Sequence, residues 1–498
     1  MKNSIICAIS FSLFPILFLF SQNSDVISLT DLVTTLAIFG IISFVGWVVL
    51  SKVLKNQRKS GIIIAIIAVL FFSYGHIFES LPFEWSLNTG GHMHIILLSA
   101  YGIIFIGVLL AILKTSKKLD NPVKIACGIG ITLCILSLSS SIGNTNEITV
   151  QDHDEGISNI ESANEKRNIY YIMFDGYASS EILKEIHGYD NSQVVNFLKS
   201  KGFVIPEKSY TNYPQTVLFL SALLNMEYLN YLTDKVGTDS KDVSPLFNMI
   251  YDNKVLKEFR DKEYRIYYLD TGFLPYPTDM KSDMNLCTSN NYFNSQFQIL
   301  ILRMSMLNPV YQKFFEDDYR EKILCTFEEI PKIHKQSDDP VFVFAQTTLP
   351  RKPFIFGPNG EEISSEVSKK GIWNNANEKG YLNQVKFAEK MMIEIVEKIR
   401  SSDEHAIIIV TSYSGSDSTL DWDNPNEEML RAKFGNFNAY YFPNGGDTII
   451  HDGISPVNVF RKILNFYFNE EYEILEDKSY FSHHKKPYDF KDITEILN

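Results

Sequence analysis

The chain has 498 residues, which is more than one ordinary domain of about 100–200 residues, and it carries a formal net charge of −13. Residues 1–149 contain 9 basic and 6 acidic side chains, and the remainder contains 37 basic and 53 acidic ones. This acidic balance argues against nucleic acid as a partner, because phosphate contacts require a basic surface.

Five apolar and almost uncharged stretches near the N-terminus predict helices that cross a membrane. They lie at 4–20, 32–51, 61–75, 93–113 and 125–142. A bilayer core needs about 20 apolar residues per helix, so the third stretch is short unless it continues to about residue 78. We predict a five-span transmembrane domain over residues 1–143.

The loops between these stretches predict their orientation. Residues 51–60 and 114–124 each contain four Lys or Arg, whereas 21–31 and 76–92 contain none. Because basic loops stay cytoplasmic, we expect the N-terminus inside and the chain after the fifth span outside. The predicted localisation is a bacterial cytoplasmic (inner) membrane, with an extracytoplasmic C-terminal domain. Cleavage of the first span as a signal peptide, which the sequence leaves open, would not change this orientation.

The region after the fifth span begins with a polar segment without periodicity, 144–166, which we interpret as a linker. The exported domain is predicted to occupy 167–498. Its buried-type strands are expected at 168–174, 264–270, 341–345, 405–410 and 438–443. Amphipathic helices are expected at 381–400 and 455–468. Alternating strands and helices predict an α/β domain with a mostly parallel central sheet flanked by helices.

Functional residues in such a sheet gather at the carboxyl ends of the strands. Asp175 follows the first predicted strand, and Tyr413 and Ser414 follow the fourth. Thr216 stands just before an apolar helix, where it suits either an N-cap or a nucleophile. Asp175 likewise suits either a turn cap or a ligand. Cys287 and Cys325 also lie in the exported region, where a disulfide is permitted but is not established by the sequence.

Six segments in order resemble a known family: "NIYYIMFDGYAS", "SYTNYPQTVLFLSALLNM", "PFIFGPNG", "YLNQVKFAEK", "FGNFNAYYFP" and "ISPVNVFRKILNFYF". With them, residues 166–495 resemble the sulfatase-like branch of the alkaline phosphatase superfamily. That superfamily includes sulfatases, lipoteichoic acid synthases and phosphoethanolamine transferases. The resemblance implies an alkaline phosphatase-like exported domain, and the N-terminal spans suit the synthase and transferase members.

The resemblance also implies roles for individual residues. In the family, an Asp after the first strand binds a divalent metal, which matches Asp175. A Thr or Ser at a helix N-terminus is the nucleophile, which matches Thr216. The family's Asp-His pair of metal ligands falls on Tyr413 and Ser414, in "SYSG". Two further family histidines fall on Gln346 and Arg351, in "QTTLPRKPF".

These departures predict that metal-dependent catalysis is lost or weakened. One carboxylate and one hydroxyl are fewer than the three or more protein ligands of usual catalytic metal sites. We therefore expect no cofactor, and we expect Arg351 and Gln346 to contact the substrate, or Arg351 to neutralise Asp175. The alternative is a rewired site with one divalent metal (Mn, Zn, Mg or Ca). Such a site would draw on other residues: Asp417, Asp421, Asp423, His451, His483 and His484.

Two functions follow from this interpretation. The first is a membrane-anchored, sulfatase/phosphotransferase-like protein of the cell envelope that binds an anionic surface glycan or lipid ester, or that scaffolds envelope synthesis. The second is an active hydrolase or transferase of phosphate or sulfate esters that uses Thr216 as its nucleophile. The sequence leaves the substrate and the presence of catalysis open.

Overall fold

The computed structural model describes residues 2–22, 29–80, 93–115, 119–142, 166–270, 282–287, 296–363, 375–418 and 421–497. The chain divides into two compact units. The first comprises Met1–Gln151, Pro275–Pro277 and Asn291–Asp317, and the second comprises Asp152–Leu274, Thr278–Asn290 and Asp318–Asn498. The predicted linker at 144–166 lies, except for its last residue, outside the described residues.

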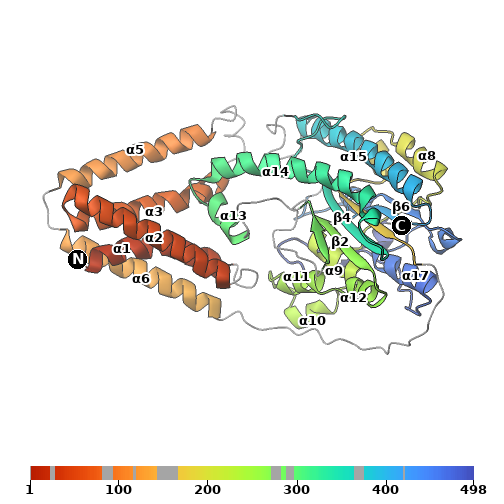
Figure 1. Cartoon of the computed structure of the whole chain (residues 1–498), viewed down its shortest axis with the longest axis horizontal. Helices are drawn as coiled ribbons and strands as arrows, with labels where there is room; N and C mark the ends of the chain where they lie inside the picture. Colours follow the sequence, from red (N-terminus) through yellow and green to blue (C-terminus); the bar gives the residue numbers. More distant parts are fainter. Residues whose placement is uncertain are drawn as a thin grey trace. The chain divides into compact units, whose positions relative to one another are not determined.

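The first unit contains the predicted membrane-spanning helices (Figure 1). They are α1 (Lys2–Ser21), α2 (Leu29–Leu54), α3 (Gln57–Ser80), α5 (Met93–Lys114) and α6 (Asp120–Ile142). All five are long and apolar enough to cross a bilayer, which confirms the five predicted stretches. The third continues to Phe78, so its apolar length is sufficient.

A later part of the chain packs on this bundle, and the sequence did not predict it. Helix α13 (Gln296–Arg303) inserts Phe297 beside Phe20, with 6.4 Å between the ring centroids. After it, the Met306 N–H donates to the Phe71 carbonyl at 2.9 Å. A Cβ at Gly75 would lie 2.4 Å from the Arg303 carbonyl oxygen, so only glycine permits this approach. Residues Asn291–Asp317 therefore belong to the first unit, although they follow β3 in the chain.

The second unit is built on a six-stranded sheet in the order β3-β2-β4-β1-β5-β6. The strands are β1 (Ile169–Asp175), β2 (Arg265–Asp270), β3 (Met284–Leu286), β4 (Val341–Pro350), β5 (Ile407–Ser412) and β6 (Asn438–Tyr441). Neighbouring strands are parallel except β5 and β6, which confirms the predicted mostly parallel sheet. Strand β4 extends five residues beyond its predicted end at 345, so Gln346 lies within the strand and not in the loop after it.

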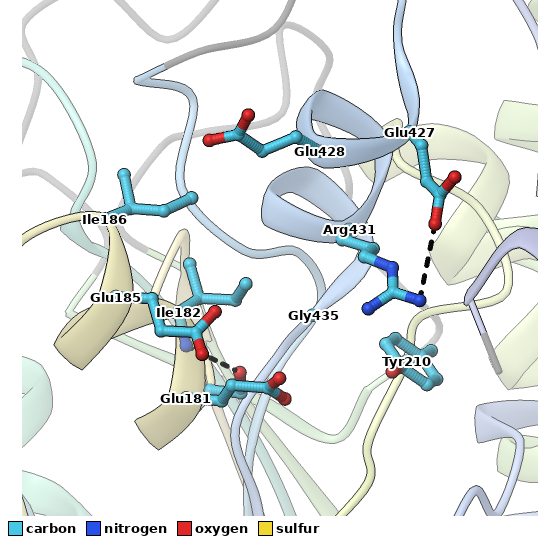
Figure 2. Close-up of a pocket in the computed structure, with 10 residues that line it drawn as sticks. Glu181, Ile182, Glu185, Ile186, Tyr210, Glu427, Glu428, Arg431 and Gly435 are labelled. Carbon is cyan, nitrogen blue, oxygen red and sulfur yellow. Dashed lines mark hydrogen bonds and ion pairs between the residues drawn. The ribbon is translucent and has the colours of Figure 1, made fainter.

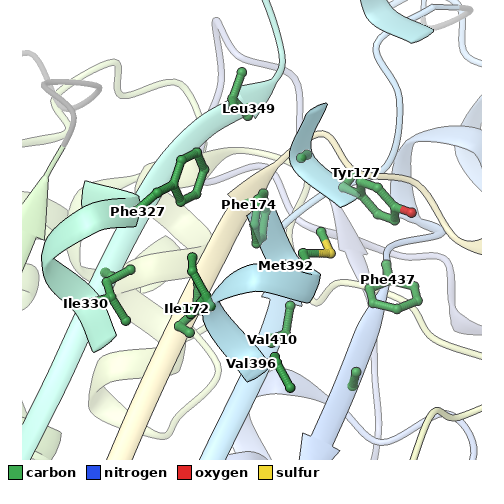
Figure 3. Close-up of a cluster of buried hydrophobic side chains, with 14 of the residues drawn as sticks. Ile172, Phe174, Tyr177, Phe327, Ile330, Leu349, Met392, Val396, Val410 and Phe437 are labelled. Atoms are coloured by element: carbon green, nitrogen blue, oxygen red, sulfur yellow. The ribbon is translucent and has the colours of Figure 1, made fainter. Parts of the chain in front are cut away.

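Helices cover both faces of this sheet. On one face Ile172, Phe174 and Val410 pack against Met392 and Val396 of α15 (Asn375–Ser402), as Figure 3 shows. On the other face the Tyr171 ring stacks on that of Phe460 in α17 (Pro456–Phe468), 5.2 Å away. The two predicted amphipathic helices are thus confirmed as α15 and α17. Because side chains alternate along a strand, Asp175 falls on the Tyr171 face of β1.

The remaining elements belong to the second unit, except for the first part of α14. They are α7 (Ser180–Glu185), α8 (Ser192–Ser200), α9 (Thr216–Asn225), α10 (Leu232–Val236), α11 (Ser244–Tyr251), α12 (Lys254–Asp261), α14 (Asn308–Glu329), η1 (Ile330–Lys335), α16 (Glu427–Phe434), η3 (Gly446–Ile449), β7 (Tyr480–Phe481), β8 (Lys491–Asp492) and α18 (Thr494–Leu497). Helix α14 begins in the segment assigned to the first unit. A disulfide joins Cys287, just after β3, to Cys325 in α14, with 5.6 Å between their Cα atoms.

Candidate functional site

Three of the predicted site residues meet at the carboxyl edge of the sheet. Asp175 ends β1 and is fully buried, Arg351 follows β4, and Tyr413 follows β5. Arg351 Nη1 lies 3.4 Å from Asp175 Oδ2 and donates to the Tyr413 hydroxyl at 2.7 Å. The Tyr413 side chain also interacts with those of Asp175 and Thr216. The strand-end rule therefore identified residues that lie together in the fold.

A second carboxylate, that of Asp417, holds the other side of the guanidinium. Arg351 Nε lies 2.9 Å from Asp417 Oδ2. Lys433 of α16 binds the other oxygen, with 2.5 Å between Nζ and Oδ1, and its side chain is only 2% exposed. Lys433 Nζ also donates to Ser414 Oγ at 3.1 Å. The result is a chain of alternating charges, Asp175–Arg351–Asp417–Lys433, which we call the charge chain.

The sequence analysis did not predict a role for Lys433, although its position between two apolar residues of a helix indicated a buried lysine. Lys433 stands between Ala432 and Phe434, and all three are buried in the last turn of α16. A lysine flanked by core residues must find a buried partner, because an unpaired buried ammonium is costly. Its partner, Asp417, is 16 residues earlier, and only the packing of α16 against the turn after β5 brings the two together.

The turn after β5 is shaped by a close approach to α16. The Gly415 N–H donates to the Lys433 carbonyl at 2.8 Å. A Cβ at position 415 would lie 2.1 Å from the Ala432 carbonyl oxygen and 2.5 Å from that of Gly435. No side chain fits at position 415, so this turn requires glycine there. This approach also brings Lys433 to Ser414 and Asp417.

Burial and ion pairing shift the pKa values of the two carboxylates of the charge chain in opposite directions. Burial raises the pKa of Asp175 to about 6, and Arg351 and Tyr413 oppose that rise only in part. Burial also acts to raise the pKa of Asp417, but Arg351 and Lys433 overcome it and hold that pKa well below its ordinary value. Asp417 is therefore the main counter-ion of Arg351, in agreement with its shorter distance to the guanidinium.

Gln346 is not placed as the sequence suggested, and Thr216 is not an N-cap, although it does stand at the start of its helix. Gln346 pairs with Met173 inside the sheet and is fully buried. Its amide oxygen and nitrogen have no hydrogen-bond partner among the residues that the structure describes. Thr216 is the first residue of α9, and the N-cap is Gln215, so the N-cap interpretation of Thr216 was wrong. The start of α9 instead directs Thr216 toward Tyr413.

Of the six residues considered for a rewired metal site, Asp417 is the one that joins the charge chain. His451 Nε2 pairs with Asp477 at 2.7 Å, and His483 Nε2 lies 3.2 Å from Asp423. The rings of His483 and His484 stack on each other with centroids 4.2 Å apart. These histidines thus have partners of their own outside the charge chain.

The residues at the carboxyl edge do not fit a divalent metal ion. Asp175 supplies a single carboxylate, and a fixed guanidinium lies 3.4 Å from one of its oxygens. A cation placed there would be repelled by Arg351, and Tyr413 and Ser414 are poor ligands for hard metals at neutral pH. Within the described ranges, no group of three or more His, Cys, Asp or Glu residues is arranged to hold a metal.

A hollow of about 450 Å³ lies between α7 and α16 (Figure 2). The residues of the charge chain do not line it, and its charged lining residues are mainly acidic. Its walls carry four glutamates, which are Glu181, Glu185, Glu427 and Glu428. Arg431 lies among them and pairs with Glu427 at 3.4 Å. Its net negative charge disfavours an anionic ligand, so we do not assign the anion-binding role to this hollow.

Comparisons with known proteins bear on the fold alone. No protein-family model matches the chain, and no curated protein matches it. Among solved structures, the lipooligosaccharide phosphoethanolamine transferase A (EptA) of Neisseria meningitidis is 12% identical with a TM-score of 0.43, over 94% of this chain and 95% of that one. The periplasmic domain of EptC from Escherichia coli, in complex with Zn, is 9% identical with a TM-score of 0.43, over 67% of this chain and 94% of that one.

A third similar structure is a protein of the alkaline phosphatase superfamily from Vibrio parahaemolyticus. It is 12% identical with a TM-score of 0.38, over 64% of this chain and 74% of that one. The names of these three structures fall within the superfamily that the sequence motifs resemble. At such low identities and TM-scores, the chemistry of this chain has to follow from its own residues.

Proposed function

We propose that this chain is a membrane-anchored protein of the cell envelope, with an extracytoplasmic sulfatase/phosphotransferase-like domain whose metal-dependent catalysis is lost or weakened. The observation that carries the proposal is the guanidinium of Arg351 between Asp175 and Asp417. Together with Lys433, this guanidinium balances the charge of the two carboxylates, as a metal cation would. It offers no open coordination position and activates no hydroxyl, so it cannot replace the catalytic work of a metal.

The retained role is binding of an anionic phosphate or sulfate ester of a surface glycan or lipid. The side chain of Arg351 is 34% exposed, so an anion in solvent can approach part of it. The N-terminus of α9 at Thr216 adds N–H groups that favour an anion. Gln346, which we had expected to contact the substrate, is buried within β4, so Arg351 carries this proposed role. A scaffold for envelope synthesis would use the same surface.

The competing function is hydrolysis or transfer of such an ester by Thr216 with a rewired metal site. It is favoured by the position of Thr216 beside Tyr413, whose side chain also interacts with Asp175. It is also favoured by Asp175 Oδ1, which is buried and has no hydrogen-bond partner within the described part of the chain. The two functions differ in whether a metal binds and whether Thr216 matters.

Purified full-length protein in detergent is expected to contain no stoichiometric manganese, zinc, magnesium or calcium by elemental mass spectrometry. Its hydrolysis of aryl phosphate and aryl sulfate is expected to remain at the background rate, because Asp175 and Thr216 alone bind a cation too weakly. Thr216→Ala should then leave that rate unchanged. A stoichiometric metal together with turnover that Thr216→Ala abolishes would establish the competing function.

The proposed location makes a separate prediction about topology. A reporter that is active only outside the cytoplasmic membrane should be active when fused after residue 150 and inactive when fused near Lys55, because of the basic loops at 51–60 and 114–124. The Cys287–Cys325 disulfide supports this orientation, since such bonds persist in oxidising compartments. The opposite reporter pattern would contradict the orientation of the whole second unit.

A further inference from the structure

A histidine lies between a carboxylate and a serine hydroxyl next to the charge chain. His187 Nδ1 is 2.6 Å from Glu378 Oε1, and His187 Nε2 is 3.5 Å from Ser418 Oγ. The imidazole side chain is fully buried, and its ring packs on that of Tyr381 with centroids 4.8 Å apart. The three residues come from the segment after α7, the first turn of α15 and the segment after β5.

The hydrogen bonds around His187 and Ser418 favour one arrangement of protons. A carboxylate only accepts hydrogen bonds, so His187 Nδ1–H donates to Glu378, and the Nε2 lone pair faces Ser418. The Ser416 hydroxyl donates to Ser418 Oγ at 2.9 Å, and the Ser418 N–H donates to Ser416 Oγ at 3.1 Å. Because Ser418 Oγ already accepts a bond from Ser416, its own proton is available to Nε2. The 3.5 Å distance is long for this bond, as distances between nucleophile and base often are without substrate.

We propose that Ser418, His187 and Glu378 form a nucleophilic site that transfers the acyl group of a carboxylic ester without a metal. Ser418 Oγ attacks the ester carbonyl carbon while its proton moves to His187 Nε2. The C–O bond to the alcohol breaks, and the alcohol leaves with that proton. His187 Nε2 then takes a proton from water, whose oxygen attacks the acyl-serine carbonyl carbon. The bond between Oγ and that carbon breaks, His187 returns the proton to Ser418 Oγ, and the carboxylic acid is released. No oxidant, reductant or metal is required.

Ser418 is also suitably exposed and placed for this role. It is partly exposed, whereas Ser412, Ser414 and Ser416 on the same segment are buried. It directly follows Asp417, which binds Arg351. The site goes beyond the proposed anion binding, and it uses neither Thr216 nor Asp175.

The test uses the folded, full-length protein in detergent, with diisopropyl fluorophosphate and p-nitrophenyl acetate as probes. Both react with serines that have an adjacent general base. We expect a single adduct, which peptide mass spectrometry locates at Ser418, and a burst of p-nitrophenol equal to one acyl group per chain. Protein that is denatured before the probe is added should not be labelled.

Variants separate catalysis from folding. Ser418→Ala should abolish the adduct, and Ser401→Ala, on an exposed serine near the end of α15, should leave it unchanged. His187→Gln should slow labelling by about a hundredfold, as expected for the loss of a general base. Glu378→Gln should slow it by at least about tenfold at an unchanged melting temperature, and Glu378→Asp should restore part of the rate. This partial rescue is expected of a positioning residue and not of a merely structural one.

Three outcomes would overturn the proposal. They are no adduct on the folded protein, an adduct at another serine or at Thr216, and labelling of Ser418 at a rate that Glu378→Gln does not change. If His187→Gln fails to fold, the Glu378 variants still decide. Metal content and the effect of Thr216→Ala test the proposed anion-binding function separately, so either idea can fail without the other.

Discussion

Replacement of Arg351 by methionine is expected to lower the free energy of unfolding by about 3 kcal/mol near pH 8, the lower end of the range for one partner removed from a buried ion pair. The change leaves Asp175, which is fully buried, without its counter-charge. Asp417 suffers less because Lys433 still binds it. The lower end applies because the Arg351 side chain is 34% exposed and is partly screened by solvent.

The penalty of Arg351→Met should depend on pH in a defined direction. In the native protein burial already raises the pKa of Asp175 to about 6, and loss of the guanidinium raises it further. The folded variant therefore binds a proton that the unfolded chain, with an ordinary Asp pKa near 4, has released. Stability falls with rising pH where the folded state holds more protons than the unfolded chain. Between about pH 4 and pH 6 the native protein and the variant both hold this proton, so the penalty should be constant there, and it should grow above about pH 6, where only the variant keeps the proton. Urea unfolding monitored by pulse proteolysis across this pH range measures it.

Arg265 provides a matched control for this experiment. Its Nε lies 3.4 Å from Asp339 Oδ2, the distance of the Arg351–Asp175 pair, but both side chains are more than half exposed. Arg265→Met should cost less than about 1 kcal/mol and show little dependence on pH. Adding Asp175→Asn to Arg351→Met should recover most of the lost stability. Equal effects of the two arginine substitutions, or no recovery in the double variant, would contradict the charge chain as a buried ion-pair network.

Replacement of both Cys287 and Cys325 by serine is expected to destabilise the second unit by about 2–4 kcal/mol. The bond closes a loop with a sequence separation of 38 residues, for which the loss of unfolded-chain entropy corresponds to about 4 kcal/mol. Part of that loop, Asn291–Asp317, belongs to the first unit. If the first unit stays folded, the loop is already restrained, which brings the effect toward the lower value.

The same urea titration, read on fragments from the second unit, measures the effect of the missing bond. Reduction of the native protein by dithiothreitol should reproduce the loss, and Cys134→Ser, at a free cysteine of the first unit, should not. Protein isolated without reductant should resist thiol alkylation at 287 and 325. Free thiols at both positions in such protein would contradict both the bond and the oxidising compartment that it supports.

Local patterns in the sequence were enough to predict the architecture. Long apolar runs predicted the five spans, since the length of a bilayer-crossing helix is set by bilayer thickness and needs no tertiary information. Buried-type runs predicted β1, β2 and β5 to within two residues at either end, because a strand covered on both faces is apolar throughout. The predicted parallel sheet in turn placed Asp175 and Tyr413 at one edge.

Tertiary packing decided what these residues do at that edge. Neither the strand pattern nor the family motifs contained Lys433, which reaches Asp417 only because α16 approaches the turn at Gly415. The sequence permitted Arg351 to bind either a ligand or Asp175, and the packed structure pairs it with both Asp175 and Asp417. The packing of α13 against the membrane-spanning helices likewise could not be predicted, because the sequence of a short apolar helix does not specify which surface it packs on.

The Ser418–His187–Glu378 arrangement shows the same division. His187 is 191 residues from Glu378 and 231 from Ser418, so no sequence motif links them. Composition and periodicity determined the class of fold and the predicted membrane spans. The identity of the groups that meet in space was decided by long-range packing, because side chains far apart in the chain acquire a common environment only when the sheet and its helices assemble.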